Sequence, residues 1–381
     1  METRDGNRLT LLANGGAYFP ALIAAFDAAR REIFLESYLF ADDASGGAVA
    51  AALGRAASRG VAVHLLIDGF GARDLPDALR ERLLRAGVEV LVFRPLRGWW
   101  PFARGRLRRM HRKLACVDSQ VAFVGGINVI DDFDAPGQVP RHDYAVRIEG
   151  PVTTQVRSAA AALWSRVFRS RTRRRWTDPG AAPAAPAGRQ RAALVVRDNL
   201  RHRDDIEKAY LDCIESAREE VVIACAYFFP GRRFRRALIE ASARGVRVVL
   251  LLQGRVEYLL LHYASRALYG SLLEAGIEIH EYHLGFLHAK VAVFDGRQAS
   301  VGSSNIDPFS LLLAQEANVF VDDARFAEQL RDGLHAAMRD GARLVPPQAW
   351  SRRPRLQRLR IWLGYGLARF GLAFYGFERW H

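Results

Sequence analysis

The sequence contains two copies of one arrangement of residues that could do chemistry. In residues 110–128, MHRKLACVDSQVAFVGGIN, a histidine is followed by a lysine, an aspartate, a glycine and an asparagine, and the same types recur in residues 287–305, LHAKVAVFDGRQASVGSSN. Each residue of the second copy lies 177 positions after its counterpart (288−111, 290−113, 295−118, 302−125 and 305−128). A single His-Lys pair is usually a surface feature, but two copies in register indicate an internal duplication.

Together these groups suit the chemistry of a phosphodiester. Lysine and asparagine side chains can stabilise charge on the non-bridging oxygens as the phosphorus becomes five-coordinate. One neutral histidine can attack the phosphorus while the other, protonated, donates to the leaving alkoxide. This requires the two copies to face each other across a pseudo-twofold axis and to share one cavity. We therefore predict one catalytic set drawn from both copies: His111, Lys113, Asn128, His288, Lys290 and Asn305.

A catalytic imidazole needs a partner that orients its other ring nitrogen. Asp143 and Glu316 lie 32 and 28 residues after the respective histidines (143−111 and 316−288), each shortly before a predicted strand. We assign them as orienting carboxylates; the alternative is an ordinary salt bridge for each.

The other repeated residues are expected to shape the backbone around the site. The aspartates follow the His-Lys pair at a strand end and are expected to fix a turn. The glycines are expected to end the following strand and let the chain bring each asparagine back toward the pair. Ser303 stands where the first copy has a glycine, so a hydroxyl contact is expected on one side only. This supporting set is Asp118, Asp295, Gly125, Gly126, Gly302 and Ser303.

The elements that position these residues alternate between helices and strands. Apolar spacing predicts helices over 17–30, 46–58 and 75–86, and strands over 32–40, 61–68 and 88–93. The second half repeats this order, with a helix over 204–217 and a strand over 220–229, and RGVAVHLLI (59–67) is matched by RGVRVVLLL (244–252). Each motif is predicted to start on a strand, which would place its histidine and lysine on one face. The fold class is therefore α/β with a partly parallel sheet, built from two related lobes.

Composition divides the chain into four parts. The first lobe is assigned to residues 1–165 and the second to 193–347. Between them, residues 166–192 are basic and then rich in proline and alanine, which indicates a flexible or extended linker. Residues 348–381 form a basic, apolar tail.

The overall charge points to an anionic partner. The chain of 381 residues carries a formal net charge of +14, which suits nucleic acid or an anionic membrane surface and does not distinguish them. The three cysteines show no CxxC spacing, so neither a disulfide framework nor a zinc site is predicted. The first residues, METRDGNRLT, contain no apolar run, and no signal peptide is expected.

Two stretches combine aromatic and basic residues and are predicted to contact a membrane surface. One is LRGWWPFARGRLRRM (96–110), and the other is the tail, whose apolar run over 361–377 is interrupted by an arginine. That run is marginal for a membrane span, so an interfacial helix is favoured over it. The alternative is a C-terminal helix packed on the protein's own core. The predicted membrane contacts are Trp99, Trp100, Phe102, Arg104, Arg106, Arg108, Arg109 and Trp362.

The pattern H-x-K-x4-D-x6-G-[GS]-x-N, present twice, resembles the phospholipase D superfamily from about Gly6 to Pro347. Within that superfamily, RDNLRHRDDIEKAY, AYFFPG and VGSSNIDPFSLLLAQEAN are similar to blocks of bacterial cardiolipin synthases. The resemblance implies a two-lobed phospholipase D-like fold in which each lobe is a mixed β-sheet flanked by helices, related by pseudo-twofold duplication. It also implies a covalent phosphohistidine intermediate, with His111 as nucleophile and His288 as general acid and base, and chemistry that needs neither metal nor cofactor.

The function implied by this resemblance is phosphatidyl transfer. One phosphatidylglycerol would give its phosphatidyl group to the enzyme and release glycerol, and a second would accept it to form cardiolipin. The expected partner is an anionic phospholipid membrane, met peripherally at the cytoplasmic side of the inner membrane, with no nucleic acid. Open alternatives are a phospholipase D-type hydrolase or transphosphatidylase, a metal-independent nuclease, and a catalytically inactive lipid-binding protein. The acceptor alcohol and the oligomeric state are not predicted.

Overall fold

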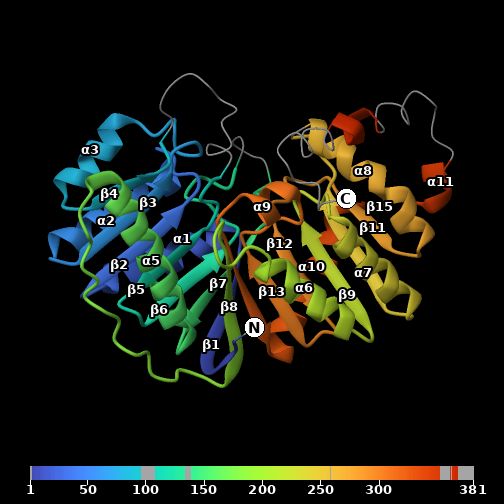
Figure 1. The fold of residues 1–381 in the computed structure, drawn as a ribbon, viewed down its shortest axis with the longest axis horizontal. Helices are drawn as coiled ribbons and strands as arrows, with labels where there is room; N and C mark the ends of the chain where they lie inside the picture. Colours follow the sequence, from blue (N-terminus) through green and yellow to red (C-terminus); the bar gives the residue numbers. More distant parts are fainter. Residues whose placement is uncertain are drawn as a thin grey trace.

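Strands and helices alternate along the first half of the chain, as the apolar spacing predicts. The computed structural model describes residues 2–95, 108–133, 139–257, 259–351, 361 and 363–367. The first half contains β1 (Arg4–Ala13), α1 (Asn14–Ala28), β2 (Glu32–Ser37), α2 (Ala44–Ser58), β3 (Ala62–Asp68), α3 (Asp77–Arg85), β4 (Glu89–Phe93), β5 (Leu114–Val117), β6 (Val121–Gly125), β7 (Tyr144–Glu149) and α5 (Val152–Thr172) (Figure 1).

The second half repeats this order. It contains β8 (Gln190–Arg197), α6 (Asp205–Ser216), β9 (Glu220–Cys225), α7 (Arg232–Ala243), β10 (Arg247–Gln253), α8 (Leu259–Glu274), β11 (Glu278–Tyr282), β12 (Lys290–Phe294), β13 (Gln298–Gly302), α9 (Pro308–Leu312), β14 (Glu316–Asp322), α10 (Ala324–Gly341), β15 (Ala342–Leu344) and α11 (Pro347–Ser351). The predicted strands 32–40 and 220–229 are shorter than expected, because β2 ends at Ser37 and β9 at Cys225.

The sheet records the duplication in its strand order. In the described part of the chain, fifteen strands form one mixed sheet in the order β15-β11-β10-β9-β12-β13-β14-β8-β1-β7-β6-β5-β2-β3-β4. Read outward from the central antiparallel pair β1–β8, the two halves have the same sequence of strands, with β15 added at one edge. The neighbours β2, β3 and β4 are parallel, and β2 pairs with β5 in the antiparallel sense. The predicted α/β fold of two related lobes is confirmed.

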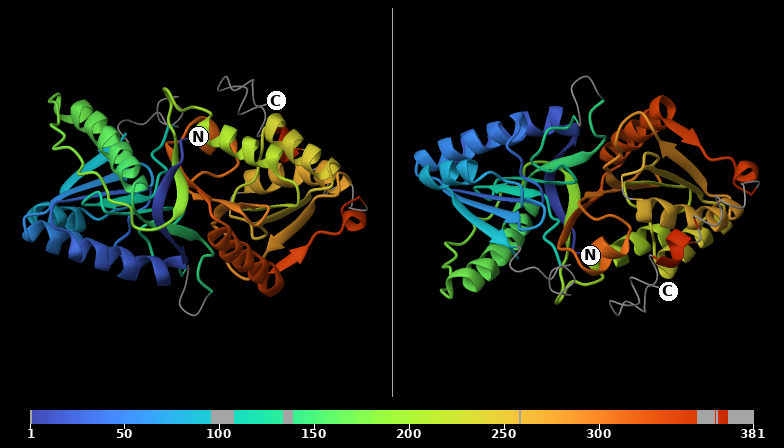
Figure 2. Two further views of the ribbon diagram at one scale, coloured as in Figure 1. Left: turned by 90° about the horizontal axis from the view of Figure 1, so that it is seen from below. Right: turned by 90° about the horizontal axis from the view of Figure 1, so that it is seen from above.

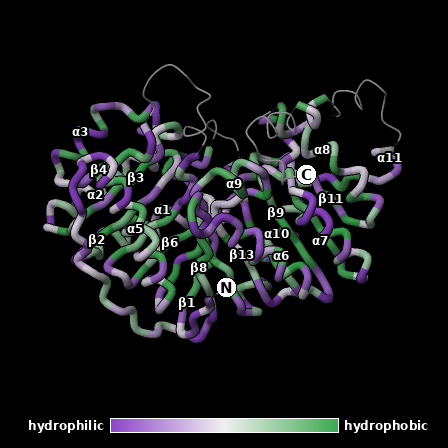
Figure 3. The backbone as a smooth tube through the Cα atoms, viewed as in Figure 1, coloured by the Kyte–Doolittle hydropathy of each residue, from purple (hydrophilic) through white to green (hydrophobic). Residues whose placement is uncertain are grey.

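Helices cover both faces of the sheet. Helices that are equivalent in the two halves lie on opposite faces. Seen from below, the blue helices α1 and α2 lie on the same side as the red-orange α10, while the green α5 lies on the side of the yellow-green α6 and α7 (Figure 2). The strands are the most hydrophobic part of the chain (Figure 3), as expected where both sheet faces are covered. On α5, for example, Trp164 is 1% exposed, and on α10 Leu334 is fully buried.

The segment between the halves is extended and held by contacts. Helix α5 continues to Thr172, beyond the predicted end of the first lobe, and no helix or strand follows until Gln190. Along the way, Asp178 pairs with the guanidinium of Arg157, and the Ala187 amide donates to the Gly6 carbonyl at 2.8 Å. The four-part division itself stays a prediction.

The described piece of the tail packs on the second half. Residues 361 and 363–367 are helical, Ile361 is buried, and the Tyr365 ring meets Phe229 edge to face at 5.8 Å between centroids. Leu363 and Leu367 are instead 52% and 62% exposed. For this piece, the alternative of packing on the protein's own core is therefore the observed one, with apolar side chains left on its outer side. Among the described helices, none combines the length and the apolar character that a bilayer crossing requires.

Candidate active site

Each motif is anchored to the other half of the molecule through backbone hydrogen bonds. The His111 amide donates to the Gln315 carbonyl at 2.9 Å, and the His288 amide donates to the His142 carbonyl at 2.9 Å. The prediction that each motif starts on a strand is wrong for the histidines, because β5 begins only at Leu114 and β12 only at Lys290. Both histidines lie in short extended segments just before these strands, where their amides are free to bond across the halves.

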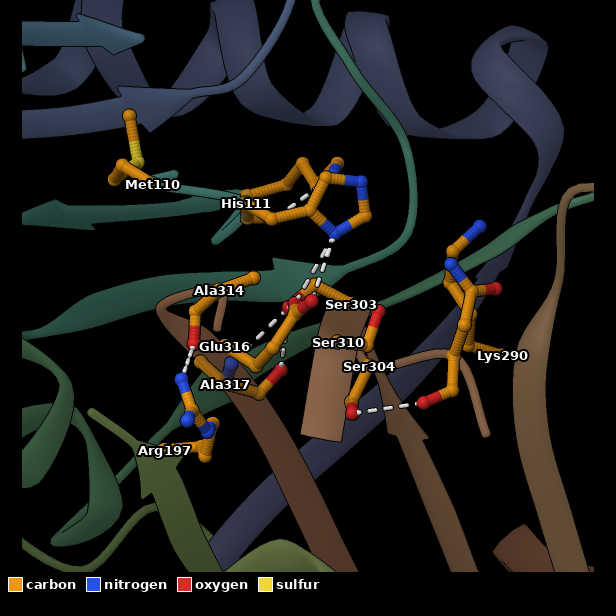
Figure 4. Close-up of polar contacts among 12 residues, drawn as sticks. Met110, His111, Arg197, Lys290, Ser303, Ser304, Ser310, Ala314, Glu316 and Ala317 are labelled. Carbon is orange, nitrogen blue, oxygen red and sulfur yellow. Dashed lines mark hydrogen bonds and ion pairs between the residues drawn. The ribbon is translucent and has the colours of Figure 1, made fainter. Parts of the chain in front are cut away.

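Because of these hydrogen bonds, each orienting carboxylate lies beside the histidine of the other motif. The His111 Nδ1 atom lies 3.0 Å from a Glu316 carboxylate oxygen, and the His288 Nδ1 atom lies 2.6 Å from Asp143 Oδ2. Each carboxylate therefore contacts the histidine of the other motif, and not the one that it follows in sequence. The reason is that each acid comes one residue after the carbonyl that holds the opposite histidine's amide. Figure 4 shows the His111 ring directed at the Glu316 carboxylate.

Both histidines open into one cavity of about 500 Å³ between the halves, which Asn128 and Asn305 also line. The histidine side chains are 17% and 18% exposed. The Leu39 amide donates to the Asn128 side-chain oxygen at 3.1 Å, which leaves the NH₂ group of that amide as the donor for a ligand. Residues from both copies of the motif therefore meet at one cavity, as the sequence predicts.

The two lysines lie beneath the histidines and are almost fully buried. Lys113 and Lys290 are 2% and 1% exposed, and each ammonium donates to the backbone carbonyl of the histidine two residues before it. Burial lowers the pKa of both ammonium groups, against the opposing charges of Glu316 and Asp143. Neither lysine lines the cavity itself, but two buried cations bonded to the backbone of the cavity histidines favour an anionic ligand there, because its charge would offset theirs.

The electrostatics of the two His-carboxylate pairs differ. Burial raises the pKa of Asp143 to about 6. Burial acts in the same direction on Glu316, but the charges and hydrogen bonds of His111, Lys113 and Ser303 outweigh it and lower that pKa below its ordinary value. Burial and the lysine charges lower the pKa of both histidines, most strongly at His288; at His111 the charge and hydrogen bond of Glu316 oppose them. The Glu316 side is therefore the more strongly ionised of the two.

One residue difference between the motifs contributes to that asymmetry. The Ser303 hydroxyl donates to a Glu316 oxygen and also accepts from the Ala317 amide at 3.1 Å (Figure 4). Its counterpart Gly126 lies against Asp143, and a Cβ atom there would come within 2.3 Å of that carboxylate. The first copy thus has room for the acid only, while the second adds a hydroxyl to it.

Gly125 and Gly302 end β6 and β13 for a steric reason. A Cβ atom at Gly125 would lie 2.5 Å from the backbone of β7, and one at Gly302 would lie 2.2 Å from the Asn318 side chain on β14. Neither glycine has a positive φ, so close approach of the next strand, and not turn geometry, accounts for them.

The motif aspartates hold turns outside the cavity. The Asp118 carboxylate accepts from the amides of Arg30, Arg31 and Glu32 at 2.8–2.9 Å. Asp295 accepts in the same way from the amides of residues 218–220. Both have left-handed backbone, with φ of 53° and 52°. These contacts support the structural role assigned to both residues.

Arg109 has a different place from the predicted one. It was assigned to membrane contact, but it lines the catalytic cavity and lies 3.5 Å from the fully buried carboxylate of Asp68. Asp68 also accepts from the Met110 amide at 2.8 Å, so it positions the chain just before His111. Arg108 is exposed, while the predicted contacts Trp99, Trp100, Phe102, Arg104, Arg106 and Trp362 lie outside the described residues.

Several cavity residues were not predicted. Tyr38 and Tyr227 line the cavity from the ends of the equivalent strands β2 and β9, and the Tyr38 ring meets His111 at 5.0 Å between centroids. The matching SYLF and AYFF segments were a signal that could have found them. Arg141 and Glu257 also line the cavity, and they have no counterpart in the repeat to mark them. Within the described ranges, no cluster of three or more His, Cys, Asp or Glu side chains is placed to hold a metal ion.

Comparison with known proteins places these features among relatives. Residues 22–164 and 210–337 match a family model described as "Cardiolipin synthase, PLD-like domain". The chain is 39% identical over 363 residues to cardiolipin synthase B of Escherichia coli, covering 91% of this chain and 85% of that protein. It is 32% identical over 337 residues to cardiolipin synthase A of Pseudomonas putida, covering 88% and 69%. A solved structure, phosphatidylserine synthase of Haemophilus influenzae, has the same fold with a TM-score of 0.70 at 12% identity, covering 95% of this chain and 93% of that one.

Proposed function

Because this chain belongs to the cardiolipin synthase family of phospholipase D-like proteins, we propose that it is a phosphatidyltransferase that makes cardiolipin from two phosphatidylglycerol molecules and releases glycerol. The observation that supports this most directly is the single cavity into which two histidines open, each held at Nδ1 by a buried carboxylate. Holding Nδ1 leaves the other ring nitrogen of each histidine for the reaction.

In the first step, Nε2 of His111 attacks the phosphorus of one phosphatidylglycerol. The bond from phosphorus to the glycerol oxygen breaks, and His288 donates its proton to that oxygen, so that glycerol leaves. The phosphatidyl group is then held on His111 through a P–N bond. Lys113, Lys290 and the side-chain amides of both motifs surround the phosphoryl oxygens and stabilise the charge that develops there.

In the second step, His288 takes the proton from the terminal hydroxyl of a second phosphatidylglycerol. The hydroxyl oxygen attacks phosphorus, the P–N bond breaks, and cardiolipin forms while His111 is regenerated. Transfer exceeds hydrolysis where the acceptor alcohol is concentrated and water is partly excluded, as at a site that opens onto a bilayer.

The contrast between the two carboxylates supports this division of roles. An ionised Glu316 keeps the Nδ1 proton of His111 in place and stabilises the positive charge on the phosphohistidine. Asp143, whose pKa burial raises to about 6, is bonded to the histidine that must gain and lose a proton in turn. In the free enzyme, burial and the lysine charges hold the pKa of His288 low, and a bound phosphodiester anion would raise it toward the range that a general acid needs.

We further propose peripheral association with an anionic membrane, at the cytoplasmic side of the inner membrane. The cavity is lined at its mouth by Phe70, Leu260 and Phe309, whose side chains are 44%, 46% and 49% exposed. Apolar side chains at the mouth, together with a net charge of +14, suit contact with anionic lipid. The Trp- and Arg-rich insert and the tail stay predicted contacts.

Incubation of the purified protein with phosphatidylglycerol vesicles in the presence of EDTA tests this function. Mass spectrometry of the lipids, with an assay for free glycerol, should show cardiolipin and glycerol in equal amounts. Phosphatidic acid in place of cardiolipin would indicate a hydrolase. Degradation of DNA with the lipid left intact would indicate the nuclease. Vesicles that also contain phosphatidylethanolamine would show which alcohol accepts the group.

A further inference from the structure

A second cavity, of about 420 Å³, lies beside the ends of β4 and α5 and is lined by four arginines. They are Arg94, Arg108, Arg166 and Arg171, and none of the described residues that line this cavity is acidic. We call it the arginine cavity. All four are exposed, so together they present positive charge to an anion that enters the cavity.

The arginines are crowded enough to affect one another. Burial lowers the pKa of Arg94, and the neighbouring charges of Arg108 and Arg109 lower it further. Two acids outside the cavity lining act on these arginines: Asp198 lies 4.0 Å from Arg166, and the charge of Asp68 opposes the lowering of the Arg94 pKa. Neither acid lines the cavity, so the described charged side chains that face it are arginines.

The rest of the lining suits a ligand that has both a polar and an apolar part. Ser170, Asn199 and Gln315 bring hydroxyl and amide groups to the same cavity as the arginines. Val92 and Leu200 bring apolar side chains, and Leu200 is 62% exposed. Arginine guanidinium groups bind phosphate oxygens in pairs of hydrogen bonds, whereas an exposed leucine favours hydrocarbon.

A thin wall of backbone separates this cavity from the catalytic one. The wall consists of residues 108–111 and 314–316, which are joined by the hydrogen bonds from the His111 amide to the Gln315 carbonyl and from the Gln315 amide to the Arg109 carbonyl. Arg109, His111 and Ala314 line the catalytic cavity, while Arg108 and Gln315 line the arginine cavity. Successive side chains of an extended segment point to opposite faces, so one wall serves both cavities.

We propose that the arginine cavity binds the phosphate group of an anionic amphiphile, an anionic phospholipid, at a site separate from the catalytic cavity. The arginines hold the phosphate, and the apolar lining contacts the hydrocarbon next to it. This binding does not depend on the reaction proposed above, because none of its side chains belongs to the two motifs.

Arginine protection resolves this site from the catalytic one. The full-length protein is treated with phenylglyoxal, alone and with inorganic phosphate, dihexanoyl phosphatidylglycerol or dihexanoyl phosphatidylcholine, and modified arginines are mapped by mass spectrometry. We expect dihexanoyl phosphatidylglycerol to protect Arg94, Arg108 and Arg171, and to do so at lower concentration than inorganic phosphate. Arg169, which lies on α5 outside the cavity lining, should be modified equally in every sample.

Each other outcome counts against the proposal. Equal modification of the cavity arginines with and without phosphatidylglycerol would overturn it, and so would equal protection by phosphatidylcholine. Protection by inorganic phosphate at the same concentration as the lipid would overturn the lipid part, leaving a free-phosphate site. As a check by substitution, Arg171→Gln should weaken the protection of Arg94 about tenfold, whereas Arg169→Gln should leave it unchanged.

Discussion

At the scale of single residues, the site depends on which acid meets which histidine. Counting along the sequence identified Asp143 and Glu316 as the orienting carboxylates, and the structure brings both to histidines. It could not identify the pairing, because the pairing depends on how the two copies approach each other and not on spacing within either copy. Arg109 was misplaced for a related reason: its sequence neighbours are basic and aromatic, but its position is set by the distant Asp68.

Glu316→Gln should reduce kcat by roughly 10²–10⁴-fold, because the neutral amide neither fixes the His111 tautomer nor stabilises the phosphohistidine charge. Initial rates of cardiolipin formation on phosphatidylglycerol vesicles measure this. Glu328→Gln, on an exposed position of α10, is the matched control and should behave as the wild type. A Glu316→Gln enzyme with wild-type kcat would contradict the orienting role.

Asp307 offers a test through pH. It lines the catalytic cavity, is 3% exposed and accepts from the Ser310 amide at 2.9 Å, and burial raises its pKa to about 7. A raised pKa means that the folded state holds the proton longer than the unfolded state, so stability is lost as pH rises toward 7. An asparagine at this position can cap α9, the helix that follows it, equally well and does not ionise. Between pH 5 and pH 8, the free energy of unfolding of the wild type should therefore fall by about 2–3 kcal/mol relative to that of Asp307→Asn.

Urea unfolding at the two pH values measures this difference. Asp323→Asn, the same exchange at the cap of α10 and outside the cavity, provides the comparison. A stability difference between Asp307→Asn and wild type that is the same at both pH values would show that Asp307 does not titrate in this range.

At the scale of elements, the sequence predicted α1, α2, α3 and α6 and many of the strands, but neither strand of the central pair β1–β8. Helices 17–30 and 46–58 and the strand 61–68 are present within a few residues as α1, α2 and β3. Strand β1 was not predicted, since only part of RDGNRLTLLA faces the core, and its buried Asn7 is satisfied by distant partners, the Val152 amide among them. Local periodicity is weak where a strand is held by long-range contacts.

The turn after β5 tests the structural role of a motif aspartate. Asp118→Ala removes the acceptor of three backbone amides and places alanine in left-handed backbone, so it should destabilise the protein by about 2–4 kcal/mol. Asp118→Asn should cost less, because asparagine tolerates that backbone and keeps one acceptor oxygen. Thermal unfolding measures both, with the exposed Asp332→Ala as the control. Full stability combined with lost kcat would instead make Asp118 a catalytic residue.

At the scale of the whole molecule, the duplication could be predicted and the crossing of the halves could not. The constant offset of 177 residues indicates two equivalent lobes, and the mirrored strand order around β1 and β8 agrees with it. The exchange of backbone hydrogen bonds and carboxylates across the axis requires coordinates. It follows that neither half alone holds a complete site.

The apolar mouth of the cavity should contribute to membrane binding. Phe70→Ser and Phe309→Ser each remove an exposed ring that would enter the lipid surface, at a cost of about 1–2 kcal/mol, or roughly 5- to 30-fold in Kd for phosphatidylglycerol vesicles. Leu84→Ser, a substitution at a 48% exposed position on α3 away from the cavity, should leave vesicle binding unchanged. Sedimentation with vesicles measures Kd; equal values for all three variants and the wild type would place the membrane-binding surface elsewhere.

The most direct measurement on the shared site is capture of the covalent intermediate. The enzyme is mixed with phosphatidylglycerol, quenched within the first turnover at alkaline pH, where the P–N bond survives, and digested for mass spectrometry. A two-histidine mechanism with His111 as the nucleophile predicts a phosphatidyl group on the His111 peptide and none on the His288 peptide. An adduct on His288, or turnover with no adduct on either histidine, would contradict it.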